Sequence, residues 1–256
     1  APTGVAAINA NGVTIHSFFQ LPLSPFVPES MVKPRFEYSK QKRQIMRTLD
    51  LLIIDEISMV RADILDAIDS ILRRFREHNK PFGGVQLLMI GDLQQLTPIV
   101  KPEEEKLLSR YYNTPYFFDS KALQSTQYVT IELTKVFRQQ DEVFINILNH
   151  FRNGNVTDND FEILNKRYQA NFNPGKNSDY IHLTTHNRIA DNINDRQLEQ
   201  IKEKAYKFCA RTEGQFPENS YPADYELTLK CGAQVMFIHN DRSERYYNGK
   251  IGRITY

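Results

Sequence analysis

The stretch that decides the fold is Leu51–Val60, with the sequence LLIIDEISMV. Four aliphatic residues, 51–54, run without polar alternation into two adjacent carboxylates, Asp55 and Glu56. An apolar run of this kind is typical of a strand in a parallel sheet that is covered on both faces. The stretch therefore predicts a buried strand that ends in two acidic residues, and a protein of the α/β class.

The residues that follow predict a helix and then a second buried strand. The helix is expected over about 62–77, because apolar residues recur there at helical spacing. Pro81 and the glycine pair 83–84 end the helix, and the strand follows at 85–90. The apolar face of the helix carries Ile64, Leu65, Ile68, Ile71, Leu72 and Phe75, and its polar face carries Asp66, Asp69, Arg73 and Arg76. Strand, helix and strand in this order form a parallel crossover unit.

The rest of the chain predicts a second lobe that becomes rich in strands. We place the boundary between two α/β lobes near residue 135, which gives lobes 1–134 and 135–256. A Pro-rich and basic insertion is expected at about 20–48, since four prolines lie between Pro22 and Pro34. Further elements are predicted as strands at 127–134 and 180–187, helices at 141–152, about 158–168 and 188–201, β-structure from about 204, and a hairpin-like close at 246–256.

Composition limits the classes of function. The chain has 256 residues, 41% of them hydrophobic, so it can form a core and is not expected to be disordered. The formal net charge is only +1, so any nucleic-acid site must be a local patch. Cys209 and Cys231 belong to no Cys/His cluster, which argues against a zinc site and a disulfide scaffold and favours a reducing compartment. No apolar run is long enough to span a membrane.

The residues themselves leave two interpretations of Asp55 and Glu56 open. Ligands bind at the carboxyl ends of parallel strands, where one carboxylate can hold Mg²⁺ and its neighbour can activate a water for phosphoryl transfer. Alternatively, the two acids are a charge pair at a helix N-terminus, worth about 0.3–1 kcal/mol. The glutamines of Gly91–Pro98, after the second strand, favour the first interpretation, because a glutamine there can hydrogen-bond a terminal phosphate. A plain polar turn is the alternative for this segment.

The chain lacks the usual phosphate-binding loop, G-x-x-x-x-G-K-[ST]. Gly-Lys occurs only at residues 175–176 and 249–250, and neither pair is followed by Ser or Thr. Within these 256 residues the pattern therefore describes half of a nucleotide site.

Five segments together resemble, in order, the motifs of Pif-type (petite integration frequency) DNA helicases of superfamily 1. They are APTGVAAINANGVTIHSFF (1–19), LLIIDEISMV (51–60), KPFGGVQLLMIGDLQQLTPI (80–99), IELTKVFRQQD (131–141) and LTTHNRIADNIN (183–194). The segments YFFDSKALQ (116–124) and GAQVMFIHND (232–241) resemble a bacterial subgroup. The resemblance implies a RecA-like parallel-sheet lobe, incomplete here, and part of a second RecA-like lobe with a β-rich C-terminal segment.

The resemblance also implies an activity and roles for particular residues. Members move 5′ to 3′ on single-stranded DNA with ATP and Mg²⁺. Asp55 would be the Mg²⁺ ligand, Glu56 the general base, Gln95 the sensor of the γ-phosphate and Arg138 an arginine finger. A surface salt bridge is the alternative for Arg138. The family's phosphate loop would precede Ala1 and its last motifs would follow the chain, so the 256 residues alone are expected to be inactive.

DNA is expected to lie along two segments. By resemblance, residues 1–19 and 183–194 would face one strand, and a grip that does not read sequence calls for hydroxyls, backbone N–H groups and some aromatic stacking. The residues concerned are Thr3, Gly4, Thr14, His16, Ser17, Thr185 and Asn187. A structural role is the alternative for His16, and core positions are the alternative for Phe18 and Phe19.

The expected partners are single-stranded and forked or duplex DNA. The protein is expected to be a cytoplasmic, nucleoid-associated monomer of DNA replication, repair and telomere maintenance. A second hypothesis is a nucleic-acid-binding or regulatory module that does not hydrolyse nucleotide, since the phosphate loop is missing.

Overall fold

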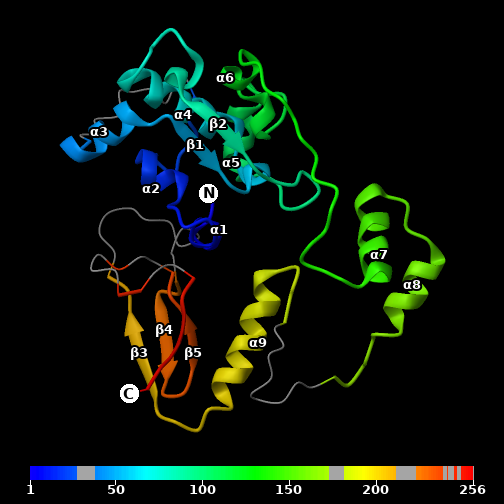
Figure 1. Ribbon diagram of the computed structural model, residues 1–256. Helices are drawn as coiled ribbons and strands as arrows, with labels where there is room; N and C mark the ends of the chain where they lie inside the picture. Colours follow the sequence, from blue (N-terminus) through cyan, green and yellow to red (C-terminus); the bar gives the residue numbers. More distant parts are fainter. Residues whose placement is uncertain are drawn as a thin grey trace. The chain divides into compact units, whose positions relative to one another are not determined.

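The computed structural model describes residues 1–27, 38–172, 182–211, 223–238, 241, 245–246 and 249–255 (Figure 1). These residues belong to two compact units, Ala1–Ile163 and Leu164–Tyr256. The boundary between the units falls inside α8 (Asp158–Asn165). The predicted lobe boundary at 134/135 stays a prediction. None of the helices in the described ranges combines the length and the apolar composition that crossing a bilayer requires.

The first unit contains the predicted parallel crossover. β1 (Leu51–Ile54) pairs in parallel with β2 (Gln86–Met89), with Leu51 opposite Gln86 and Ile54 opposite Met89. The helix α4 (Ala62–Phe75) connects the two strands. All three elements confirm the sequence-based prediction to within a few residues.

The two faces of this small sheet differ in burial, which the unalternating sequence does not predict. Ile54 is buried, and Leu52, Leu87 and Met89 pack against the core on the same face. On the other face, four aliphatic side chains are about half exposed, namely Leu51, Ile53, Leu88 and Ile90. Within the described residues the sheet is therefore covered on one face only.

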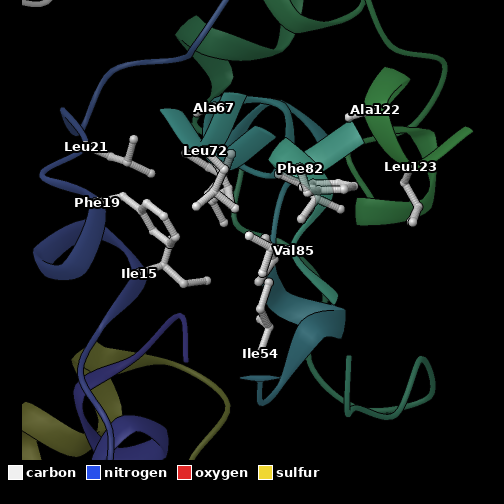
Figure 2. Packing of buried hydrophobic residues seen from close by; sticks show 14 of the residues in the cluster. Ile15, Phe19, Leu21, Ile54, Ala67, Leu72, Phe82, Val85, Ala122 and Leu123 are labelled. Carbon is white, nitrogen blue, oxygen red and sulfur yellow. The ribbon is translucent and has the colours of Figure 1, made fainter. Parts of the chain in front are cut away.

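The hydrophobic core of the first unit surrounds α4. Leu65, Ile68 and Leu72 of α4 are fully buried. Phe82 and Val85 belong to the same cluster as Leu72 (Figure 2). Figure 2 also labels Ile15, Phe19 and Leu21, which enter the same cluster from the N-terminal segment. Each such side chain contributes about 1.5–3 kcal/mol when removed from water, so α4 is the main support of this unit.

Three acidic residues on α4 hold loops, whereas the sequence suggests an ordinary polar helix face. Asp63 accepts a hydrogen bond from Phe26 N at 2.9 Å, and Asp69 accepts one from Phe82 N. Asp66 accepts four, from Tyr112 Oη (2.8 Å), Ser120 Oγ (2.6 Å), Lys121 N (3.1 Å) and Ala122 N (3.0 Å). Burial raises the pKa of the Tyr112 phenol, and its hydrogen bond to Asp66 adds to the effect. The polar face of α4 is therefore an anchoring surface for the segments around it.

Short helices complete the first unit. They are α1 (Gly4–Asn9), α2 (Ile15–Phe19), α3 (Lys40–Thr48), η2 (Ile57–Met59), η3 (Pro81–Gly84), α5 (Pro102–Leu108), η4 (Phe117–Asp119), α6 (Lys121–Gln124) and α7 (Glu142–Asn153). α7 and α8 confirm the predicted helices at 141–152 and 158–168. Residues 28–37 of the predicted insertion lie outside the described residues, and α3 is part of the remainder.

The predicted strand at 127–134 is wrong. Residues 127–134 form neither strand nor helix, and Val129, Ile131 and Leu133 are 80–88% exposed. The segment has the apolar and β-branched residues of a strand, but a strand is stable only when a neighbour pairs with it, and no described residue does so. Local composition alone therefore misled this prediction.

The second unit consists of α9 (Asn187–Glu199) and two antiparallel strand pairs. β3 (Ala205–Cys209) pairs with β4 (Glu226–Lys230), and β5 (Gln234–Met236) pairs with β6 (Ile251–Arg253). The β-rich segment and the helix at 188–201 are thus confirmed. Residues 180 and 181 of the predicted strand lie outside the described residues, and 182–186 form no strand. Residues 247, 248 and 256 of the hairpin-like close expected at 246–256 lie outside the described residues, and residues 251–253 pair with 234–236.

Candidate nucleotide site and DNA-contact segments

Asp55 and Glu56 lie at the carboxyl end of β1, where the chain turns sharply. Ile90 N donates to Ile54 O at 2.9 Å, and Ile57 N donates to Ile90 O at 2.9 Å, so the two strand ends stay tied beyond the sheet. Glu56 must adopt left-handed backbone angles between these bonds (φ 54°, ψ 45°). Such a conformation costs about 1–3 kcal/mol for a residue other than glycine. The strain lies at the predicted general base.

Gly91 allows β2 to end against this turn. A Cβ atom at position 91 would lie 2.9 Å from Ile57 Cγ2 and 3.0 Å from Ile57 N. Since real side chains do not approach so closely, position 91 requires glycine. The close approach brings the segment that follows β2 beside the Asp55–Glu56 turn.

Asp92 organises the segment that carries Gln95. Its Oδ1 accepts from Gln94 N at 3.0 Å, and its Oδ2 accepts from Gln95 Nε2 at 3.1 Å. Arg152 of α7 forms a two-point ion pair with the same carboxylate, at 3.0 Å and 3.1 Å. Burial opposes ionisation of Asp92, but these hydrogen bonds and the charge of Arg152 outweigh it and lower the pKa of the carboxyl. Gln95 is exposed and oriented by a charged neighbour.

The carboxylates at the end of β1 fit Mg²⁺ held together with a nucleotide. Mg²⁺ is usually bound by one or two carboxylates, with waters and substrate phosphates filling the other positions. Asp55 Oδ1 accepts from Glu56 N at 3.0 Å, which leaves Oδ2 available. In the part of the chain that the structure describes, no group of three or more His, Cys, Asp or Glu side chains could hold a metal alone. The donor set thus suits a metal shared with phosphates.

Arg138 does not contact this site. The residue is exposed in the segment between 126 and α7, and no hydrogen bond or ion pair joins it to Asp55, Glu56 or Gln95 in the described structure. The arginine-finger assignment therefore stays a prediction.

The N-terminal residues that are predicted to contact DNA lie at two adjoining helix starts. Thr3 Oγ1 accepts from Ala6 N at 3.3 Å and caps α1, and Thr14 Oγ1 accepts from Ser17 N at 3.3 Å and caps α2. Ile15 N donates to Ala1 O at 2.9 Å, so the two starts are held together. Gly4 is the first residue of α1, and Ser17 is exposed.

His16 of α2 is half-buried, which disfavours the charged form of its ring. Burial lowers the pKa of the imidazole, the charge of Arg61 lowers it further, and Asp63 opposes both effects. The two phenylalanines beside it differ, since Phe19 is buried in the core. Phe18 is partly buried and has Lys42 Nζ 3.8 Å from its ring centre. The alternative of a core position is confirmed for Phe19, and Phe18 packs partly against the core.

Thr185 and Asn187 belong to the second unit. Thr185 Oγ1 lies 2.9 Å from His186 Nδ1, and Asn187 is the first residue of α9. The two residues are thus close together at the start of this helix.

A family model described as PIF1-like helicase matches residues 1–162, which is more than half of the chain. The chain belongs to the PIF1-like helicase family. This match covers the turn at Asp55–Glu56, the segment with Gln95 and the N-terminal helix starts.

Comparison with individual PIF1 proteins supports the same conclusion. The chain is 34% identical over 266 residues to the ATP-dependent DNA helicase PIF1 of Candida albicans, covering 99% of this chain and 29% of that protein. It is 41% identical to a solved Bacteroides Pif1 helicase in complex with ADP-AlF3 and ssDNA, with a TM-score of 0.87. It is 42% identical, also with a TM-score of 0.87, to a chain from a structure of two coordinating Pif1 helicases that unwind forked dsDNA.

The chain spans only part of these PIF1 proteins. All of it is covered in both structural matches, but it accounts for 58% of the first solved chain and 60% of the second. The likeness confirms the predicted fold class, a RecA-like parallel-sheet lobe with part of a second RecA-like lobe.

Sequence reasoning missed the role of Asp92. The residue stands three positions before Gln95 and has the spacing of an aspartate that accepts from its own following backbone. That signal was present in the sequence, but the partner Arg152 is 60 residues away and appears only in the folded chain.

Proposed function

We propose that the complete protein is an ATP-dependent DNA helicase that moves 5′ to 3′ along a single strand. The observation that carries the proposal is the tied pair of strand ends, where Asp55, Glu56 and the Asp92–Gln95 segment meet in a chain of the PIF1-like helicase family. The relatives that carry the names of ATP-dependent helicases and of complexes with ADP-AlF3 and ssDNA support it.

The residues would divide the work of phosphoryl transfer. Asp55 would hold Mg²⁺, which neutralises phosphate charge when it is bound with ATP. Glu56 would accept the proton of the attacking water, Gln95 would contact the γ-phosphate, and Arg138 would stabilise the charge that develops on it. The strained backbone of Glu56 supports its role, because strain of this kind concentrates at functional positions.

DNA would be held without sequence preference. Thr3, Gly4, Thr14, His16 and Ser17 would contact the strand from the first unit, and the second unit would contribute two residues, Thr185 and Asn187. Forked duplex DNA is the proposed substrate. Action as a monomer on the bacterial nucleoid in the cytoplasm, in replication, repair and telomere maintenance, belongs to the same proposal.

The test is DNA-stimulated ATP hydrolysis by the complete protein. Glu56→Gln is expected to lower kcat at least 100-fold and to leave ATP binding intact, since general-base catalysis contributes about 10²–10⁴-fold. Glu103→Gln, at an exposed position on α5, is the matched control. Full activity of Glu56→Gln would remove the base assignment.

A second substitution tests the finger. Arg138→Ala is expected to lower kcat about 10³-fold or more with a smaller change in KM. Arg110→Ala, at another exposed arginine of the first unit, is its control. If the complete protein binds single-stranded DNA but hydrolyses no ATP, the alternative of a non-hydrolysing nucleic-acid-binding module replaces the proposal.

A further inference from the structure

A cavity of about 240 Å³ lies within the first unit, beside the residues proposed to contact DNA. Thr3 and His16 line it from the N-terminal helices, and Arg61 and Ile64 line it from the start of α4. Cavities for drug-sized ligands are about 300–1,000 Å³. This cavity is therefore suited to a single small ring system.

The cavity is apolar at its base and has an apolar rim. Ile15 and Ile64, at its base, are 5% and 7% exposed. Leu23 and Ile99, from two separate loops, also line it but are 82% and 76% exposed. Two such aliphatic side chains beside an opening leave apolar surface in water, which a flat apolar ligand between them would cover.

One side of the cavity is polar but has no uncompensated charge. Arg61 donates to both oxygens of buried Asp63, at 2.7 and 2.8 Å, and to Glu104 Oε2 at 2.7 Å. The charged residues of the lining are Arg61, Lys101 and Glu104; Asp63 lies outside the lining but is bound to Arg61, and with it the local charges are two of each sign. This balance favours a neutral ligand over a phosphate.

The polar groups suit an edge that both donates and accepts hydrogen bonds. Glu104 Oε1 is an acceptor, and the neutral His16 ring has one donor and one acceptor nitrogen. An aliphatic side chain of a protein partner would leave these groups without partners, which costs free energy. A nucleobase has both the apolar faces and the mixed polar edge.

We propose that this cavity receives one nucleobase of the bound single strand, turned out of the stack, with its faces between Leu23 and Ile99 and its edge toward His16 and Glu104. The inference rests on the proposed function, because it requires that the strand run past Thr3 and His16. A base held in the cavity would fix the position of the strand along the protein, since the DNA backbone cannot slide freely while that base is bound.

The test uses 2-aminopurine placed singly at each position of a deoxythymidine decamer bound to the complete protein. The lining contains no Phe, Tyr or Trp, so a base in the cavity escapes the stacking that quenches 2-aminopurine. Emission is expected to rise at one or two positions only. Replacing the base there by an abasic residue should weaken binding about tenfold, within the range for losing one stacked base. Free 2-aminopurine deoxyriboside should give no rise.

Leu23→Ala and Ile99→Ala are expected to abolish the rise and the abasic penalty. Both residues are exposed, so the fold should tolerate the changes. Leu96→Ala is the matched control, because Leu96 lies in the same loop as Ile99, is 68% exposed and does not line the cavity.

Two results would overturn the inference while DNA binding stands. One is emission that rises at no position or equally at all positions. The other is a loss in Leu96→Ala as large as that in Ile99→Ala. If the decamer does not bind at all, the proposed function falls as well.

Discussion

Both units of this chain contain helices and strands, but the described residues of the two units differ greatly in burial. In the first unit α4 has seven buried residues and is surrounded by a contiguous core. In the second unit α9 is of almost the same length, yet it has no buried residue, and every residue of β3 is exposed. Of the hydrophobic residues described in the second unit, Ala233 alone is buried.

This difference distinguishes elements held by backbone hydrogen bonds alone from elements that are also held by buried side chains. α9 and the strand pairs of the second unit satisfy their backbone hydrogen bonds within the helix and within each pair, and few of their side chains are buried. α4 has the same local bonds and in addition anchors the core and three loops. Equal substitutions in the two units should therefore have unequal consequences, and the following experiments use matched pairs of residues.

The largest difference is expected for isoleucine. Ile68 in α4 is fully buried, whereas Ile189 in α9 is 43% exposed. Ile68→Ala should lower the free energy of unfolding of the first unit by about 2–5 kcal/mol. Ile189→Ala should change that of the second unit by less than about 1 kcal/mol, because little surface leaves water there. Hydrogen exchange with mass spectrometry of the complete protein in urea reads both units, and equal losses would contradict the comparison.

Aspartate gives the next largest contrast. Four groups donate hydrogen bonds to the carboxylate of Asp66. In Asp66→Asn one of the two acceptor oxygens becomes an NH₂ donor, so some of these groups lose their acceptor and stay buried without one. We expect a cost of about 2–4 kcal/mol, with earlier exchange at residues 112–122. Asp191→Asn, on the exposed surface of α9, should have no measurable effect. A stable Asp66→Asn variant would mean that the anchoring bonds contribute little.

The third comparison is between two glycines. Gly91 of the first unit is required by a close approach to Ile57, and Gly232 of the second unit is favoured by its positive φ. Gly91→Ala pushes a methyl group against Ile57, which should cost about 1–3 kcal/mol. It should also lower ATP turnover about tenfold by moving the Gln95 segment. Gly232→Ala meets no atom within 4 Å, and its cost of about 1–2 kcal/mol comes from a φ of 84° alone. Unchanged turnover in Gly91→Ala would show that the close approach is dispensable.

The smallest expected effect is a pH dependence of the first unit. The pKa of His16 is lowered by burial, so the folded state disfavours protonation. The contribution of the neutral ring to stability is complete above the unfolded value of about 6.5. It is lost as the pH falls from there through the folded pKa. Unfolding at pH 7.5 and 5.5 should therefore differ more in the wild type than in His16→Gln; the same difference in both would exclude His16 as its source.

The crossover was predictable because its signal is local and repeated. The apolar run 51–54, the helical spacing of 62–77 and the apolar run 85–90 each predict one element, the breakers at 81–84 separate the last two, and the structure contains all three. The strand at 127–134 failed for the opposite reason. Its residues favour a strand, but pairing depends on a neighbour that the local sequence does not specify.

The candidate site divides in the same way. Asp55 and Glu56 could be proposed as candidates because they follow a strand end directly, and Gln95 because it stands after the next strand in a segment that resembles the family. The αL backbone of Glu56, the tie between Ile57 and Ile90 and the pairing of Asp92 with Arg152 could not, because they depend on contacts between distant segments.

The carboxylate of Asp92 accepts hydrogen bonds from Gln94 N, Gln95 Nε2 and Arg152, and this sharing makes the free energies of the three interactions interdependent. A ligand that draws the Gln95 amide toward itself removes one hydrogen bond from Asp92. The strength of the ion pair between Asp92 and Arg152 then changes. Because such coupling is reciprocal, displacing α7 must change the affinity of Gln95 for that ligand by the same factor. Through Asp92, the interaction of Gln95 with a ligand and the ion pair with α7 share one coupling free energy. That coupling free energy can be measured by perturbing either the ligand or α7.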